Sequence, residues 1–366
     1  MGFKCGIVGL PNVGKSTLFN ALLSTIQAEA ANYPFCTIEP NVGRVNVPDE
    51  RLDKLAAIAG SAQIIPTQLE FVDIAGLVRG ASKGEGLGNQ FLAHIREVDA
   101  IIYMLRCFED GNITHVEGAI DPMRDSEIVE TELVLADLES LEKRLPALQK
   151  KAKTDKEIAE QVAVIEKVLA VVSEGHPARE TVLKDDAEKR QMKLLQLLTS
   201  KPVLYVCNVD EGSAAGGNTM SAKVMEMAAK KKAPCVVVSA RIEAEISMLP
   251  SEEDKKEFLS SLELTETGLS RIIKAGYELL DLSTYFTVGP KEARAWTITR
   301  GTAAPAAAGV IHTDFEKGFI RAETIAYDDY IANKGETGAK EAGKFRLEGK
   351  EYRVKDGDVL HFRFNN

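Results

Sequence analysis

The sequence predicts a doubly wound α/β domain that is interrupted by a helical hairpin and followed by a small α+β domain. A glycine-rich loop, residues 9–17, lies between a strand-like run and a helix-like run, and strands and helices alternate after it. Apolar residues then recur at coiled-coil spacing, and the last stretch changes to short β-like runs with turns. We therefore expect the α/β domain at 1–127 and 200–282, the insertion at 128–199 and the final domain at 283–366.

The composition is that of an ordinary globular protein, with 366 residues, 45% hydrophobic and 27% charged. A net charge of −10 argues against general attraction to nucleic acid, although it leaves room for a local basic patch. The chain has no apolar run of membrane-spanning length and no signal peptide, and its five scattered cysteines show no metal spacing. We expect a cytoplasmic protein with reduced thiols and no membrane partner.

Residues 9–17 read Gly-Leu-Pro-Asn-Val-Gly-Lys-Ser-Thr, which fits the phosphate-binding pattern G-x-x-x-x-G-K-[ST]. A polyphosphate needs several backbone N–H groups that point inward, so the loop must be tight and glycine-rich, and the helix that follows adds its positive dipole end. Lys15 is expected to reach the β- and γ-phosphates, and the Ser16 hydroxyl is expected to hold Mg²⁺. A glycine-rich turn without a ligand is the alternative.

Two further loops are candidates for contacting the γ-phosphate and its metal. Residues 30–41 contain two prolines that exclude a helix, and Thr37 is the candidate there for a Mg²⁺ ligand that binds only with the γ-phosphate present. An ordinary loop threonine would look identical. The strand-like run 68–73 ends in Asp73, which suits a carboxylate in the second shell of the metal, and the Gly76 N–H can bond the γ-phosphate.

Leu77 occupies the place where Ras-like GTPases carry a glutamine that orients the attacking water. Leucine has neither donor nor acceptor, so hydrolysis must be slow or another group must position the water. His115, in a polar loop after the strand that ends at Arg106, is the candidate, and a plain loop histidine is the alternative. Four glycines within residues 80–88 suggest a segment that reorganises with nucleotide state.

The run 208–211 reads Asn-Val-Asp-Glu, where guanine-specific proteins of this class carry Asn-Lys-x-Asp. In those proteins the aspartate accepts two hydrogen bonds from guanine. Here Glu211 is one methylene longer, and Val209 replaces the lysine whose stem packs on the base. Adenine has no N1–H to donate, so we expect ATP rather than GTP. The predicted base-side contacts are Asn208, Val209, Glu211, Ser239 and Ala240, the last two from the turn after the next strand.

The insertion contains two apolar seams with 4-3-4-3 spacing, separated by a polar turn, which predicts an antiparallel helical hairpin. Pro146 lies inside the first seam. The seams are Val134, Leu138, Leu141, Leu145 and Leu148, and then Ile158, Val162, Ile165, Leu169 and Val172.

The predicted tip of this hairpin carries six basic residues, with Asp155 as the acidic residue among them. One interpretation is a solvated helix surface, and the other is a basic projection that touches RNA phosphate. The six are Lys143, Arg144, Lys150, Lys151, Lys153 and Lys156.

These motifs resemble the YchF subfamily of Obg-related P-loop NTPases, and the resemblance covers essentially the whole chain. The run 208–211 resembles the altered base-reading loop that sets this subfamily apart. The tail resembles its C-terminal TGS domain, a ubiquitin-like β-grasp module shared with threonyl-tRNA synthetases, and nothing in the tail resembles catalytic machinery. The loops that resemble the Obg type are residues 9–17, 35–41, 73–77 and 80–88, and those that resemble the TGS domain are Trp296, 312–321 and 356–362.

The resemblance implies an ATPase that binds GTP less well and that associates with the ribosome and its large subunit, through rRNA or ribosomal protein. It implies Mg²⁺ ligands at Ser16 and Thr37, a backbone contact of Val209 with the base, and a histidine at the place of His115. Some related NTPases hold a catalytic K⁺ with a loop asparagine, so K⁺ is a candidate cofactor at Asn12. The implied nucleotide contacts are Asn12, Val13, Gly14, Lys15, Ser16 and Thr17.

Two other functions remain open at this point: a GTP-preferring translational GTPase, and a ribosome- or RNA-binding module whose hydrolysis is vestigial. The favoured hypothesis is a nucleotide-state switch in translation or stress response. A monomer is favoured, although the sequence does not determine the oligomeric state.

Overall fold

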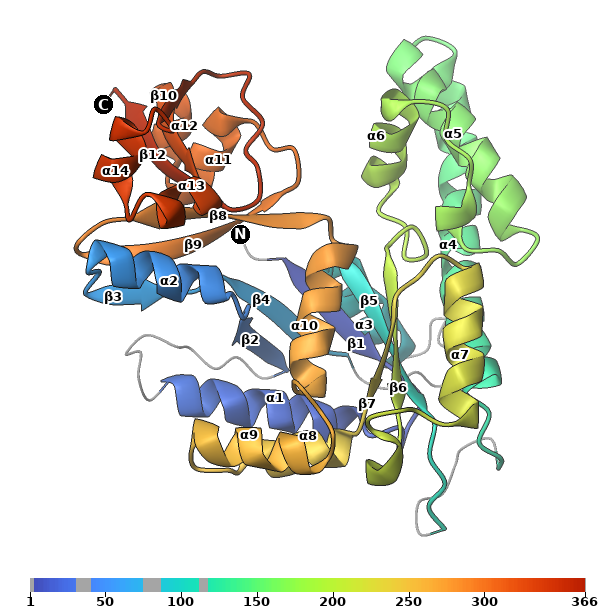
Figure 1. Cartoon of the computed structure of the whole chain (residues 1–366). Coiled ribbons are helices and arrows are strands. Elements are labelled where there is room, and N and C mark those ends of the chain that lie inside the picture. Colours follow the sequence, from blue (N-terminus) through green and yellow to red (C-terminus); the bar gives the residue numbers. More distant parts are fainter. Residues whose placement is uncertain (1–2, 31–40, 75–86, 112–117, 366) are drawn as a thin grey trace. The chain divides into compact units, whose positions relative to one another are not determined.

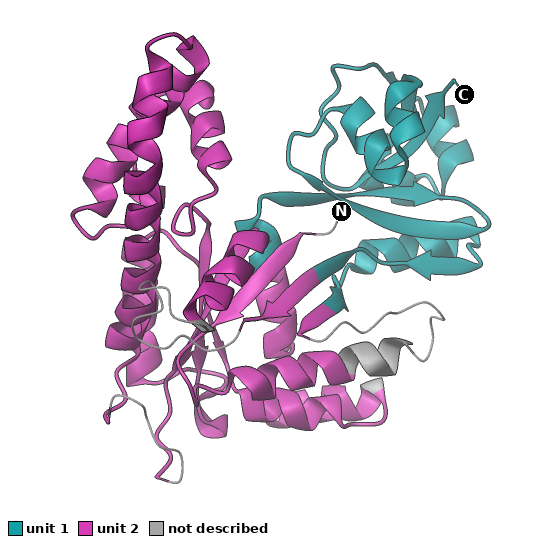
Figure 2. Ribbon diagram, turned by 180° about the vertical axis from the view of Figure 1, so that it is seen from behind, with its two compact units in different colours: residues 1–2, 44–69, 276–366 teal, residues 3–43, 70–275 magenta. Residues whose placement is uncertain are grey.

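The computed structural model describes residues 3–30, 41–74, 87–111 and 118–365 (Figure 1). The chain separates into two compact units (Figure 2). The larger unit contains residues 3–43 and 70–275, and the smaller unit contains residues 1–2, 44–69 and 276–366. Within the described residues, no helix is long and apolar enough to cross a membrane.

The larger unit is built on a six-stranded sheet in the order β2-β4-β1-β5-β6-β7. The pairs β1–β4, β1–β5, β5–β6 and β6–β7 are parallel. Every residue of β5 and β6 is buried, as expected for strands covered on both faces. The strand order reverses beside β1, which puts the carboxyl ends of β1, β4 and β5 next to one another. The strands are β1 Lys4–Val8, β2 Val42–Asn46, β4 Gln68–Asp73, β5 Ala100–Arg106, β6 Val203–Asn208 and β7 Cys235–Val238.

Helices pack on this sheet from the connections between the strands. Helix α1 packs along α8, whereas α4 contacts both β5 and α7, and α3 contacts β1. The helices are α1 Lys15–Ala30, α3 Leu87–Glu97, α4 Pro122–Ala152, α7 Thr219–Lys230, α8 Ala240–Ser247, α9 Glu252–Ser261 and α10 Gly268–Leu279.

The predicted helical hairpin is present, and it is formed by α4 and α5 (Lys156–Val172). The Asp121 carboxylate caps α4, so the first helix begins six residues before the expected boundary at 128. Asp155 caps α5 and accepts from two backbone N–H groups. Helix α6 (Asp186–Leu195) adds to the apolar cluster between them, which includes the buried residues Val134, Leu141, Ile165, Val168, Val172, Met192 and Leu195.

The smaller unit has its own six-stranded sheet in the order β11-β10-β12-β8-β9-β3. Its pairs are antiparallel except β8–β12 and β3–β9, which are parallel. The strands are β3 Gln63–Ile65, β8 Leu282–Val288, β9 Glu292–Thr299, β10 Phe319–Ala326, β11 Arg346–Glu348 and β12 Asp358–Phe364. The helices are α2 Glu50–Ala59, α11 Ala304–Ile311, α12 Thr313–Lys317, α13 Tyr327–Ala332 and α14 Glu336–Glu341.

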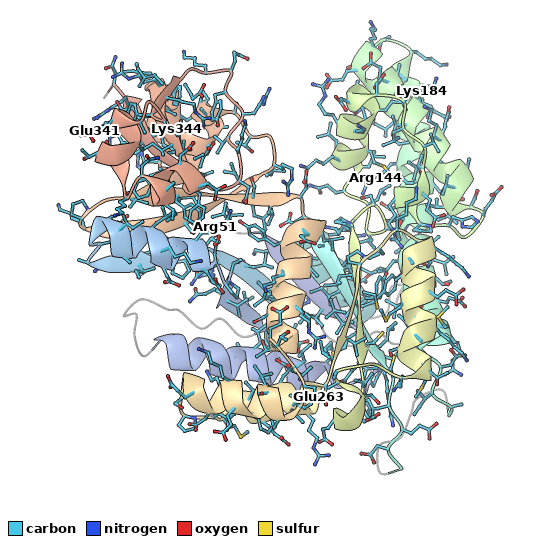
Figure 3. The ribbon with its side chains drawn as sticks, viewed as in Figure 1. Arg51, Arg144, Lys184, Glu263, Glu341 and Lys344 are labelled. Atoms are coloured by element: carbon cyan, nitrogen blue, oxygen red, sulfur yellow. The ribbon has the colours of Figure 1, made fainter. Side chains whose placement is uncertain are left out.

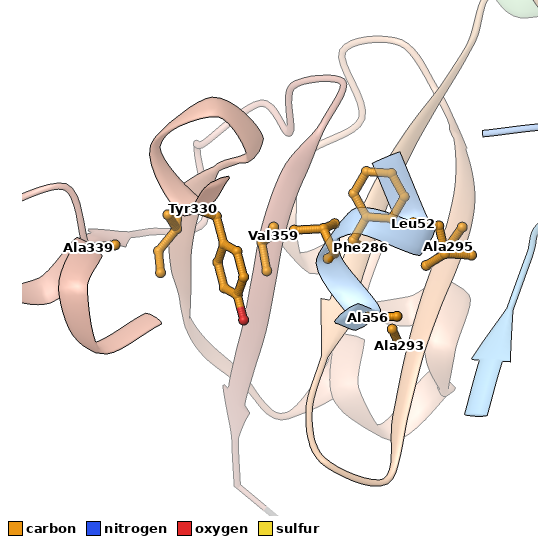
Figure 4. Packing of buried hydrophobic residues seen from close by; sticks show 10 residues of the cluster. Leu52, Ala56, Phe286, Ala293, Ala295, Tyr330, Ala339 and Val359 are labelled. Carbon is orange, nitrogen blue, oxygen red and sulfur yellow. The ribbon is translucent and has the colours of Figure 1, made fainter. Parts of the chain in front are cut away.

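The division of the chain differs from the expected boundaries, because residues 44–69 belong with the smaller unit rather than with the α/β domain. Their helix α2 buries Leu52 and Leu55 in a core that also contains Phe286 and Ala295 (Figure 4). Strand β3 extends the same sheet beside β9. The chain therefore leaves the larger unit within β2 and returns to it within β4.

Candidate active site

The glycine-rich loop joins β1 to α1, and its two glycines lie where a side chain would not fit. A β-carbon on Gly9 would lie 2.7 Å from the carbonyl oxygen of Met104. Gly14 has a φ of +93°, and a β-carbon there would lie 2.3 Å from Nδ2 of Asn208. Helix α1 begins directly afterwards, at Lys15, so the loop leads into a helix N-terminus. Because these two positions carry no side chain, an anion can come close to the backbone of the loop.

Asn208, at the end of β6, ties this loop to the loop after β7. Its Nδ2 donates to the carbonyl oxygen of Val13 at 2.8 Å, and its Oδ1 accepts from the N–H of Ala240 at 2.9 Å. The side chain is only 4% exposed, so both halves of the buried amide are satisfied by backbone groups. The sequence predicted Asn208 as a base-side contact, and the structure places it as the bridge between two of the ligand loops.

Lys15 and Asp73 meet at the start of α1 and the end of β4. The ammonium group and the Asp73 carboxylate form an ion pair, and both side chains are largely buried. A phosphate ligand would compete with Asp73 for Lys15. Ser16 and Thr17, one and two residues further along α1, are exposed.

The donor set at this place fits a hard divalent cation. A serine hydroxyl and a carboxylate are oxygen ligands of the kind that Mg²⁺ prefers, and Mg²⁺ normally completes its shell with water and phosphate oxygens. Among the described residues, no group of three or more histidine, cysteine or acidic side chains could hold a metal alone. Ser16 and Asp73 therefore suit a metal that arrives with a phosphate ligand.

A pocket of about 580 Å³ connects the phosphate loop with the loops after β5, β6 and β7, which is within the range of small-molecule sites. It brings together most of the predicted nucleotide-contacting positions, which come from three separate stretches of chain, and a fourth stretch that contains Phe108. Its walls include Asn12, Gly14, Thr17, Phe108, Asn208, Val209, Glu211, Ser239, Ala240 and Arg241.

Two of the acidic side chains that line this pocket, Asp210 and Glu211, are engaged within the protein. The Asp210 carboxylate accepts from the backbone N–H and hydroxyl of Ser213, at 3.1 and 3.0 Å, and so caps a short 3₁₀ turn. Glu211 Oε1 lies 2.8 Å from Nε of Arg241. The Ala240 N–H is also used, since it donates to Asn208. A guanine base that used Asp210 or Glu211 as its acceptor would share that carboxylate with these partners.

Phe108 and Arg241 line the pocket, although the sequence reasoning did not single them out. Arg106, only 1% exposed, positions Phe108: its Nε donates to the Phe108 carbonyl oxygen at 3.2 Å, and its guanidinium lies 4.7 Å from the centre of the ring. An aromatic residue two positions after the end of a buried strand was the available signal for Phe108. For Arg241, the signal was a cation directly after the predicted turn at Ser239 and Ala240.

Several predicted residues lie outside the described part of the chain. They include the proposed metal ligand Thr37, the γ-phosphate contact Gly76 and the water-positioning candidate His115, together with Leu77. Most of the glycine-rich stretch 80–88 is also outside. Their roles stay predictions.

Comparison with known proteins identifies the family. Residues 4–137 match a family model described as "50S ribosome-binding GTPase", and residues 282–365 match the model YchF-GTPase_C, described as "Protein of unknown function (DUF933)". A Haemophilus ducreyi protein named ribosome-binding ATPase YchF is 58% identical over 366 residues, which cover 100% of both chains. The chain belongs to the YchF family.

Other YchF proteins agree over the full length. Those of Bacillus subtilis and Escherichia coli O157:H7, also named ribosome-binding ATPase YchF, are 55% and 56% identical, with 100% of each chain covered. A solved structure, described as that of the Schizosaccharomyces pombe YchF GTPase, has a TM-score of 0.89 and 40% identity over 99% of this chain and 98% of that one. The predicted family and the predicted fold class, a P-loop α/β domain with a helical hairpin and an α+β tail, are confirmed.

Proposed function

We propose that this chain is a Mg²⁺-dependent ATPase that binds the ribosome and acts as a nucleotide-state switch in translation or stress response. The names of its full-length relatives support both activities. The observation that carries the proposal is the pocket that joins the phosphate loop to a base-side wall where the carboxylates of Asp210 and Glu211 already have partners. Ribosome binding implies a cytoplasmic location, and a monomer remains the favoured state.

The catalytic roles follow from the chemistry of each group. Lys15 neutralises charge on the β- and γ-phosphates, and the N-terminus of α1 adds backbone donors. Mg²⁺, held through Ser16 with help from Asp73 and Thr37, would supply further charge neutralisation at the phosphate oxygens.

Residues outside the described part complete the proposed reaction. The Gly76 N–H bonds the γ-phosphate, and His115 takes over the positioning of water that Leu77 does not perform. Asn12 lines the pocket and makes K⁺ a candidate second cofactor. Equal rates of ATP hydrolysis in Na⁺ and K⁺ buffers would exclude K⁺ as a cofactor.

The choice between ATP and GTP is the first point to test, because the structural relative from Schizosaccharomyces pombe is described as a GTPase. We expect ATP to bind more tightly than GTP in calorimetric titrations with Mg²⁺. The full chain should hydrolyse ATP, and Lys15→Ala should abolish turnover because the phosphate charge is no longer neutralised. Tighter binding of GTP would support the GTPase alternative. Turnover that is undetectable with and without ribosomes would instead favour a binding module with vestigial hydrolysis.

For the ribosome, we propose that the tip of the hairpin contacts RNA phosphate on the large subunit. Lys150, Lys151, Lys153 and Lys156 are exposed there. The Asp155 carboxylate faces the start of α5 as its cap. The other two basic residues are engaged: Lys143 pairs with Glu139 at 2.6 Å, and Arg144 (Figure 3) donates to the carbonyl oxygen of Leu195 at 3.2 Å. Four lysines thus present a local positive surface on an acidic protein.

Replacing Lys150, Lys151 and Lys153 together with alanine should weaken co-sedimentation with ribosomes. The loss should be larger at low salt, and the salt dependence of binding should flatten, because fewer counterions are released from phosphate. A matched control replaces Lys223, Lys230 and Lys256, three exposed lysines away from the tip, and should leave binding unchanged. Unchanged binding of the tip variant would remove the hairpin tip from the interface.

A further inference from the structure

We propose that Arg241 makes the site favour adenine over guanine by holding Glu211. This inference rests on the proposed function and names a determinant of its substrate choice. Arg241 is a positioning residue in this account, since it acts on the base through the Glu211 carboxylate.

The two side chains come from different loops and meet at the wall of the nucleotide pocket. Glu211 is the first residue of the 3₁₀ turn after β6, and Arg241 is the second residue of α8. Nε of Arg241 lies 2.8 Å from Oε1 of Glu211, and both residues line the pocket. At this distance, Arg241 is a charged hydrogen-bond donor to the Glu211 carboxylate.

The backbone on each side of the pair is anchored, which fixes where the two side chains begin. The turn that carries Glu211 is capped by Asp210, which accepts from Ser213. The start of α8 is held by the hydrogen bond from the Ala240 N–H to Asn208. The two residues can therefore move mainly through rotation of their side chains. The side chain of Glu211 is 43% exposed and that of Arg241 is 75% exposed.

The hydrogen-bonding groups of the two bases determine which base the Arg241–Glu211 pair favours. Guanine presents N1–H and N2–H₂ as donors on its Watson–Crick edge, and a free carboxylate is a suitable acceptor for both. Adenine presents the N1 lone pair at that edge, which a free carboxylate repels. The Arg241 guanidinium occupies an acceptor oxygen of Glu211 and offsets its charge. Both effects disfavour guanine relative to adenine.

The test uses the full chain and measures the dissociation constants of ATP and GTP with Mg²⁺. Arg241→Met removes the charge and keeps the aliphatic stem, so Glu211 is freed with little loss of packing. We expect the preference for ATP over GTP to fall by about three- to fivefold, which is the scale of an exposed ion pair. Arg241→Lys restores a cation and should recover part of the preference.

The same substitutions in a Glu211→Gln background show whether Arg241 acts through the carboxylate. There the preference should be insensitive to Arg241→Met, because no negative charge is left to release. An unchanged preference in Arg241→Met overturns the proposal, as does an equal effect in both backgrounds. The wild-type ratio separately tests the proposed ATP preference, whereas the change in the ratio tests Arg241. The two proposals can therefore fail independently.

Discussion

A β-carbon on Gly14 would meet the buried amide of Asn208, and the φ of +93° is unfavourable for any other residue. We expect Gly14→Ala to weaken ATP binding by about 5- to 150-fold, because relieving a strain of about 1–3 kcal/mol would displace either the loop or Asn208. Calorimetric titration of ATP measures this loss directly. Gly216→Ala is the matched control, because a β-carbon at Gly216 meets nothing within 4 Å and its φ is not positive. Wild-type affinity in Gly14→Ala would contradict the assignment of the loop.

The sequence could predict single residues that belong to a recognisable motif or that lie at the end of a strand-like run. Lys15 and Asp73 were both singled out, because a phosphate-loop motif follows one strand and the carboxylate ends another. Their ion pair with each other was not predicted. The roles of Arg106 and Arg241 could not be predicted, because each depends on which loops meet in space. Arg106 holds Phe108 through contacts that no sequence spacing specifies.

At the level of elements, Glu130 joins three of them. Glu130 lies on α4, and its carboxylate pairs with Arg179 in the 3₁₀ helix Ala178–Glu180. The same carboxylate lies 2.6 Å from Nζ of Lys231, just after the C-terminal end of α7. Burial alone would raise the pKa of Glu130, but Arg179 and Lys231 outweigh it and hold that pKa below its usual value near 4.5. The depressed pKa means that the pair contributes stability above about pH 4.5 and loses it as the pH falls through the folded-state pKa.

Glu130→Gln should therefore lower the free energy of unfolding by about 3 kcal/mol at pH 7, because two cations would lose their partner. The difference from wild type should shrink as the pH drops below about 4.5, where the carboxylate of the unfolded chain becomes protonated. It should disappear below the depressed folded-state pKa, where the native carboxylate is protonated as well. Urea unfolding at a series of pH values measures both quantities. A difference that stays constant from pH 7 to pH 3 would show that charge pairing is not its cause.

The hairpin shows why periodic elements were predictable from the sequence. Its apolar seams are local patterns, and the structure packs them in one cluster. Pro146 leaves α4 continuous from Pro122 to Ala152. Pro146 and Glu142, whose carbonyl oxygen loses its helical partner, are both exposed, so water can satisfy the lost hydrogen bond. Helix α4 begins before the expected insertion boundary at 128 because its cap at Asp121 precedes the apolar seam.

At the scale of the whole molecule, the smaller unit depends on two distant stretches of chain. Leu55, fully buried, packs in the core formed with the C-terminal strands. Leu55→Ala should lower the stability of this unit by about 2–5 kcal/mol, the usual range for a buried leucine. Hydrogen exchange should quicken in β8 and β9 while β5 and β6 stay protected. Leu135→Ala, at a position 44% exposed on α4, should leave the exchange of the smaller unit unchanged. Protection in β8 and β9 that survives Leu55→Ala would contradict this dependence.

The membership of residues 44–69 could not be read from the sequence, and the physical reason is the pairing of β3 with β9. Such pairing joins residues more than two hundred positions apart, and a three-residue strand carries little periodic signal of its own. Because residues 44–69 lie between strands of the α/β domain in the chain, they were assigned to that domain.

This arrangement has a consequence for the order in which the protein can fold on the ribosome. Leu52 and Leu55 are synthesised early, whereas Phe286 and Ala295, which share their core, follow more than two hundred residues later. At about 5–20 residues per second, α2 waits about ten to fifty seconds for the strands that cover its apolar face. During each round of synthesis, the apolar residues of this ten-residue segment therefore stay unburied, available to chaperones and to other nascent chains.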